Sequence, residues 1–209
     1  MDQKTSLIEQ GLENLRLDLL DALGGANLHL QPETISRSLY AKVRAKLKVL
    51  EQVLRRLLVL LAMTLDLAPV RPRALQAAAP LPEGVEDVTS SFRAHLPALY
   101  RMALMGRPSG PPRDFGALAS TRLSGPVPAM PLMRRAAVLL KIMKNPDAAA
   151  RRMARLIGRM KRRGEAKPYC LPLAARGRLR PELALLTSAI TLEVNAALAD
   201  WPGPVPDTS

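Results

Sequence analysis

One long stretch, residues 33–67, constrains the fold more than any other part of the chain. Its apolar side chains recur at alternating intervals of three and four, the period of a helix packed against another helix. This seam consists of Tyr40, Val43, Leu47, Leu50, Leu54, Leu57 and Leu61. Every side chain in residues 57–63 is apolar, and a helix that is apolar on all sides must be surrounded by other elements. The sequence therefore predicts a central helix that the rest of the chain covers.

The role of this seam has two interpretations. It is either the packing surface of an intramolecular core or an oligomer interface with a second helical chain. Pro32 and Glu33 suit the first turn of the helix. At about 1.5 Å per residue, residues 33–67 would extend about 50 Å, which exceeds the width of a compact domain of this size. This length keeps a helical partner, self or other, as an alternative to intramolecular packing.

Capping signals and apolar stripes predict further helices around the central one. Ser6 and Glu9 have the spacing of a capping box, so we expect a first helix over residues 7–23, closed by Gly24. Asn145 precedes a proline and an acid, which is a strong helix start. The other predicted helices cover residues 88–105, 131–144, 146–163 and 181–201.

Composition indicates how these helices pack. Apolar residues are mostly Leu and Ala, and the aromatics are only one Trp, three Tyr and two Phe, which favours helix packing over a β-sandwich. The 19 prolines cluster between the helical stretches. We therefore predict an all-α fold, a helical bundle of five or six helices around one long central helix with Pro-rich connections. It forms a single helical domain over residues 1–201, with irregular connections at about 68–87 and 106–130 and a frayed tail over 202–209.

The formal net charge of +13 is unevenly distributed. Residues 129–180 hold fifteen Lys and Arg against two Asp and Glu, whereas residues 1–31 and 181–209 are both acidic. One interpretation is a negatively charged partner attracted by the basic middle. The other is that the acidic terminal helices neutralise basic helices within the fold. The acids of the first helix, including Asp18, are expected to lie off its apolar stripe.

The basic helix over residues 146–163 is the main candidate binding site. Arginine presents a planar fork that matches paired phosphate or carboxylate oxygens. The candidate partner- or phosphate-binding residues are Arg151, Arg152, Arg155, Arg159, Lys161, Arg162 and Arg163 on this helix and Arg134 and Arg135 on the helix before it. Three ligands suit such a surface: an acidic protein, the phosphates of duplex DNA or structured RNA, and an anionic membrane surface. A merely solvated basic face is the remaining alternative.

Motifs for catalysis are lacking in the sequence. His29 and His95 are far apart, and Cys170 has no histidine near it in sequence, so we nominate no catalytic residue. No spacing typical of metal ligands, phosphate loops or nucleic-acid-binding motifs is found, and we expect no metal or cofactor. We therefore predict a non-enzymatic helical binding or assembly module for an acidic protein partner. Nucleic-acid binding and peripheral membrane binding are the alternatives.

Localisation is predicted from the termini and the apolar runs. The N-terminal segment is acidic and lacks the basic and apolar regions of a secretory signal. The uncharged window over residues 57–65 is much shorter than the roughly 20 residues of a membrane span. We expect a cytoplasmic protein without a membrane span.

Two Leu/Ala/Arg-rich stretches carry a resemblance. LLVLLAMTLDLAPVRPR at residues 57–73 and AAARRMARLIGR at residues 148–159 resemble sequences of alphaproteobacterial proteins that have no known activity. The resemblance covers less than half of the chain. It implies a bacterial cytoplasmic protein, and no functional residue is transferred by it.

Overall fold

The computed structural model describes residues 2–65, 125–174 and 176–202. Within these ranges the chain forms five α-helices, two short 3-10 helices and one two-stranded ribbon. The α-helices are α1 (Asp2–Gly24), α2 (Arg37–Met63), α4 (Met130–Lys144), α5 (Pro146–Arg162) and α6 (Pro181–Ala197). The 3-10 helices are η1 (Leu28–Leu30) and η3 (Arg176–Arg178). The predicted all-α helical bundle is confirmed.

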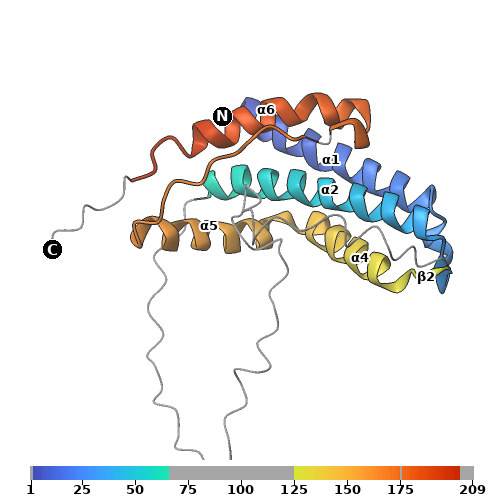
Figure 1. Cartoon of the computed structure of the whole chain (residues 1–209). Helices are drawn as coiled ribbons and strands as arrows, with labels where there is room; N and C mark the ends of the chain where they lie inside the picture. Colours follow the sequence, from blue (N-terminus) through green and yellow to red (C-terminus); the bar gives the residue numbers. More distant parts are fainter. Residues whose placement is uncertain (1, 66–124, 175, 203–209) are drawn as a thin grey trace, which may run out of the picture.

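Helix α2 is the central element of this bundle. It contacts α1, α4, α5 and α6, and Figure 1 shows it between α1 and α6 on one side and α4 and α5 on the other. Residues 53–60 of α2 are all buried, including Arg55 and Arg56. The all-round apolar run is therefore interior because neighbouring helices cover every side of it.

The predicted seam of α2 lies in the intramolecular core. Its buried members are Val43, Leu47, Leu50, Leu54 and Leu57, and Leu61 is partly buried against the same core. Burying one such leucine stabilises the fold by about 1.5–3 kcal/mol. Because Leu50 and Leu54 are 0 % exposed, this part of the seam serves packing within the chain and offers no surface to a second chain.

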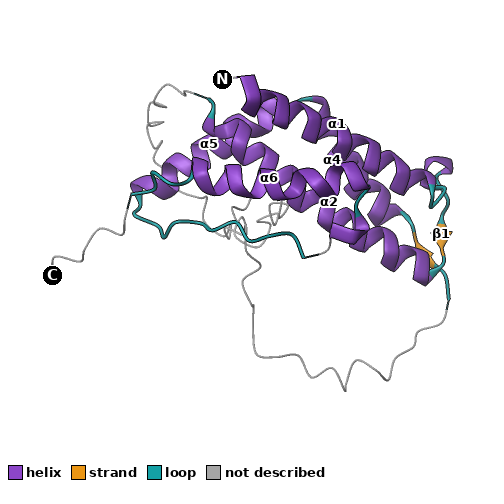
Figure 2. Ribbon diagram, turned by 90° about the horizontal axis from the view of Figure 1, so that it is seen from above, coloured by secondary structure: helices purple, strands orange, loops and turns teal. Residues whose placement is uncertain are grey.

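Helix α2 begins four residues later than residue 33, where the sequence pattern predicts its start. The preceding chain is extended, because Thr34–Ile35 (β1) pairs antiparallel with Val127–Pro128 (β2). The Glu33 carbonyl accepts a hydrogen bond of 2.9 Å from the Ala129 N–H beside this ribbon. Ser36 then caps the helix through its side-chain oxygen. Figure 2 shows β1 at one end of the bundle, where it connects the start of α2 to the segment before α4.

The predicted end of α2 and the predicted start of α1 are also wrong. Helix α2 ends at Met63 rather than at residue 67, and the Thr64 hydroxyl donates a hydrogen bond to a carbonyl of its last turn. Helix α1 begins at Asp2, so Ser6 lies inside the helix and does not form the predicted N-terminal cap. The glycine pair does end α1, since its last residue is Gly24.

The C-terminal helices match their predicted starts more closely. α4, α5 and α6 each begin within one residue of the predicted position. α6 ends at Ala197 rather than at residue 201, although Trp201 is buried as its stripe position requires. The predicted helix over residues 88–105 and the connection over 68–87 lie outside the described residues, as do residues 203–209 of the tail.

A buried acid joins three helices. Asp18 of α1 is 0 % exposed, so the expectation that it lies off the buried stripe is wrong. Its carboxylate lies 2.6 Å from the Lys46 ammonium of α2 and accepts a hydrogen bond of 2.9 Å from the Arg180 N–H, at the start of α6. Asp21 lies 3.2 Å from the same ammonium. The acidic first helix therefore neutralises part of the basic central helix within the fold.

Candidate functional site

Helix α5 carries the main predicted basic surface, and its local sequence explains its position. The Asn145 side chain caps the helix by accepting a hydrogen bond of 3.3 Å from the Ala148 N–H, and Pro146 follows in the first turn. The buried residues of α5 are Ala149, Ala150, Met153 and Ile157. This face packs on α2, which leaves the opposite face of α5 to solvent.

The solvent-facing side of α5 carries an arginine row, defined here as Arg151, Arg155, Arg159 and Arg162. All four residues are exposed. Their spacing of four, four and three residues keeps them on one helix face over about 16 Å. In the part of the chain that the structure describes, none of the four makes an ion pair with an acidic side chain. The row therefore presents four positive charges to solvent.

The other predicted basic residues of α5 and its end have different surroundings. Arg152 is exposed beside the row. The Lys161 ammonium lies 5.6 Å from the centre of the Trp201 ring, a cation–π contact that holds it against the C-terminal segment. Arg163 forms an exposed pair of 3.8 Å with Glu165, which contributes little to stability. These residues broaden the basic surface at the C-terminal end of α5.

The two predicted arginines of α4 have different roles. Arg134 is exposed, and Figure 1 places α4 on the same side of α2 as α5. Arg135 donates two hydrogen bonds to the carboxylate of Glu51, whose side chain is only 10 % exposed. These hydrogen bonds raise the pKa of Arg135. Arg135 therefore joins α4 to α2, and its fork is already occupied by a carboxylate of the same chain.

A buried polar cluster around Arg56 is not predicted by the sequence pattern. The guanidinium of Arg56 donates to the Thr191 hydroxyl at 2.7 Å and to the Leu171 carbonyl at 2.6 Å. Cys170 is buried beside it, and the Asn195 side chain bonds both backbone polar groups of Cys170 at 2.9 Å. Burial lowers the pKa of Arg56 and raises the pKa of the Cys170 thiol. This cluster fixes the segment before η3 to α2 and α6.

The histidines and acids form no constellation in the described residues. His29 lies exposed in η1, while His95 is outside the described ranges. Across residues 2–65, 125–174 and 176–202, no three His, Cys, Asp or Glu side chains are placed to hold a metal ion. In the same ranges, no helix has the length and apolar character needed to cross a membrane.

Comparison with known proteins gives no family to which the chain can be assigned. No family model matches it, and no curated protein or solved structure is significantly similar to it. Function must therefore be inferred from the side chains of this chain.

Proposed function

We propose that this protein is a non-enzymatic helical binding or assembly module that engages an acidic protein partner through the arginine row of α5. The observation that carries the proposal is the exposure and the common orientation of the four arginines in the row. Its four guanidinium groups are exposed, share one helix face and have no acidic partner among the described residues. Such a surface is complementary to a surface of negative charge.

The spacing of the row suits an acidic helix. Arg151, Arg155 and Arg159 follow one another at intervals of four residues, about 6 Å along the axis, and Arg162 follows after three residues, about 4.5 Å. A partner helix with Glu or Asp at every fourth residue presents carboxylates at the same interval. Each guanidinium fork accommodates one carboxylate through two parallel hydrogen bonds. Four such pairs define the register of the two helices as well as their attraction.

The flank of the row favours a protein over a nucleic acid. Leu156 lies between the row and the buried face and remains partly exposed. Met160, seven residues after the buried Met153 and on the same face, is also partly exposed near the end of the helix. Arginine and methionine beside apolar side chains are typical of protein–protein interfaces. The chain has only six aromatics (one Trp, three Tyr, two Phe), which provides little surface for base stacking.

The test compares three ligands on the full-length protein by fluorescence anisotropy. The ligands are a labelled helical peptide with Glu at every fourth position and Leu on the adjacent face, a duplex DNA and a structured RNA. The row variant is Arg151→Gln/Arg155→Gln/Arg159→Gln. The matched control variant, Lys4→Gln/Arg16→Gln/Lys42→Gln, removes the same charge from exposed positions on α1 and α2.

We expect the peptide to bind the wild-type protein and to lose at least tenfold in affinity for the row variant, since several charge-assisted hydrogen bonds are removed. The control variant should change the affinity by less than about twofold. A duplex that binds more tightly than the peptide, with a log–log salt slope near −0.9 per phosphate contacted, would instead assign the row to nucleic acid. Equal losses of peptide affinity in the two variants would show that the peptide is held by nonspecific charge attraction and not by the row.

A further inference from the structure

A separate groove runs along the N-terminal half of α2. Its volume is about 480 Å³, within the range of small-molecule sites. Helix α2 supplies one wall through Arg37, Tyr40, Arg44, Lys48 and two alanines, all on one helix face. Val127 of β2 and Arg178 of η3 also line the groove. The groove shares no residue with the arginine row, so it does not depend on the proposed function.

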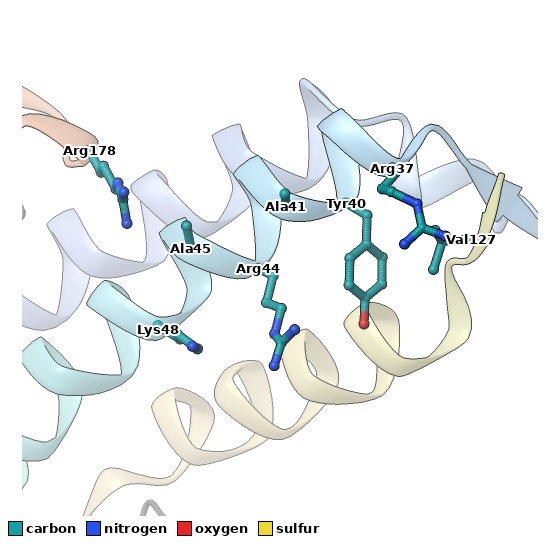
Figure 3. Close-up of a pocket in the computed structure, with 8 residues that line it drawn as sticks. All are labelled: Arg37, Tyr40, Ala41, Arg44, Ala45, Lys48, Val127 and Arg178. Atoms are coloured by element: carbon teal, nitrogen blue, oxygen red, sulfur yellow. The ribbon is translucent and has the colours of Figure 1, made fainter. Parts of the chain in front are cut away.

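The arrangement of these side chains leaves an open, positively charged hollow. Figure 3 shows Arg178 entering from its own segment near one end and Arg37 with Val127 at the other, while Arg44 and Tyr40 extend from α2 between them. The two α2 residues that face the middle of the groove, Ala41 and Ala45, carry only a methyl group. Their small size leaves space between the longer cationic side chains.

The four cations of the groove have no neutralising partners among the residues that the structure describes. Among the described residues, the lining contains no carboxylate. In the described parts of the chain, no ion pair involves Arg37, Arg44, Lys48 or Arg178. By contrast Lys46, on the face of α2 toward α1, lies 2.6 Å from the buried Asp18 carboxylate. Four uncompensated positive charges around one hollow concentrate anions there.

We infer that this groove binds an oligophosphate, a small anion with two or more linked phosphates. Arg44 and Lys48 are one helical turn apart, about 6 Å, and Arg37 and Arg44 are two turns apart, about 10 Å. One phosphate is too small to engage all of these cations, whereas a chain of phosphates spans them. The arginine forks match phosphate oxygens in pairs, and Lys48 adds a point charge.

Tyr40 and the end of α2 add to this recognition. The phenol of Tyr40 lines the groove and provides one hydroxyl donor in addition to the cations. The groove also begins in the first turn of α2, where the helix dipole places partial positive charge. The same chemistry is offered by two sources, a free oligophosphate and the multiply phosphorylated headgroup of an inositol lipid.

The test measures binding of inorganic triphosphate to the full-length protein by isothermal titration calorimetry at low salt. The groove variant is Arg37→Gln/Arg44→Gln/Lys48→Gln, and the row variant serves as the control because it removes the same charge. In parallel, both variants and the wild type are sedimented with phosphatidylcholine vesicles that contain or lack phosphatidylinositol bisphosphate. Far-UV circular dichroism verifies that each variant retains the wild-type helix content.

We expect triphosphate affinity to fall at least tenfold in the groove variant and less than about twofold in the row variant. Triphosphate binding without vesicle binding identifies a free oligophosphate as the source. Vesicle binding that requires both the inositol lipid and the groove residues identifies the lipid headgroup as the source of the phosphates. The inference is overturned if the wild type binds neither probe, or if the row variant loses as much affinity as the groove variant.

Discussion

Replacing Asp18 with alanine tests how α1, α2 and α6 are held together. The carboxylate is 0 % exposed and serves two groups, the Lys46 ammonium at 2.6 Å and the Arg180 N–H at 2.9 Å. A hydrogen bond to a charged group contributes about 1.5–3 kcal/mol, and removing one partner of a buried ion pair costs about 3–5 kcal/mol. Because Lys46 is 21 % exposed and keeps Asp21 as a partner, the cost of removing Asp18 should lie at the lower end of the range for a buried ion pair. We expect Asp18→Ala to lower the free energy of unfolding by about 3 kcal/mol.

The matched control is Asp21→Ala, which removes a carboxylate that contacts the same ammonium. The Asp21 side chain is 65 % exposed, so its pair with Lys46 is screened by water and should contribute about 0.5 kcal/mol or less. Urea unfolding followed by circular dichroism measures both changes. For a chain of this size, about 3 kcal/mol corresponds to a fall in Tm of about 6–12 °C.

The outcome that refutes this reasoning is a small effect at the buried site. If Asp18→Ala costs less than about 1 kcal/mol, or no more than Asp21→Ala, the buried carboxylate does not anchor the three helices. The structural account of the α1–α2–α6 junction would then be wrong.

Two further predictions concern other buried groups. Glu51→Gln removes the charge that binds Arg135 and should lower the free energy of unfolding by about 2–3 kcal/mol. A double-mutant cycle with Arg135→Met should give a coupling energy above about 0.5 kcal/mol. If the effects of the two substitutions are additive, the ion pair between Glu51 and Arg135 does not stabilise the fold. Burial raises the pKa of Cys170, so the folded protein keeps a thiol protonated that the unfolded chain ionises near pH 8.5–9. The contribution of Cys170 to the free energy of unfolding is therefore fully present below the pKa of the thiol in the unfolded chain. It is lost as the pH rises toward the higher pKa of the thiol in the folded protein. Urea unfolding from about pH 7 to 10 should show a smaller decline for Cys170→Ala than for the wild type, and identical declines would refute the assignment.

The sequence predicts those features of this protein that local signals determine. The seam of α2 follows from the helical period alone, and the start of α5 follows from Asn145 and Pro146 at adjacent positions. The arginine row is likewise a matter of spacing within one helix. These features need no information from distant parts of the chain.

The features that the sequence pattern misses depend on partners far away in the chain. Asp18 is buried because the Arg180 N–H, 162 residues later, bonds its carboxylate. Arg56 is buried because Thr191, 135 residues later, accepts its hydrogen bond. Arg135 leaves the external basic surface because Glu51, 84 residues earlier, binds it. Spacing within one helix contains no information about these contacts. A charged residue within an apolar run is the local signal that could have indicated a buried polar contact.

The start of α2 is predicted wrongly for a related reason. Pro32 and Glu33 are good residues for a first helical turn, but the backbone at Glu33 is bonded to the chain at Ala129. The ribbon of β1 and β2 then places the start of the helix at Ser36. Pairing between distant segments overrides a local preference whose contribution is only about 1 kcal/mol.

The most direct test of the proposed function is to locate the bound peptide on the protein. Uniformly ¹⁵N-labelled protein is titrated with the Glu-spaced helical peptide, and the Nε–Hε signals of the arginines are followed by NMR. The proposal predicts that the signals of Arg151, Arg155, Arg159 and Arg162 shift together and saturate at one peptide per chain. Shifts that spare α5 and instead involve α6, where Leu185 and Leu192 are 79 % and 70 % exposed, would contradict it.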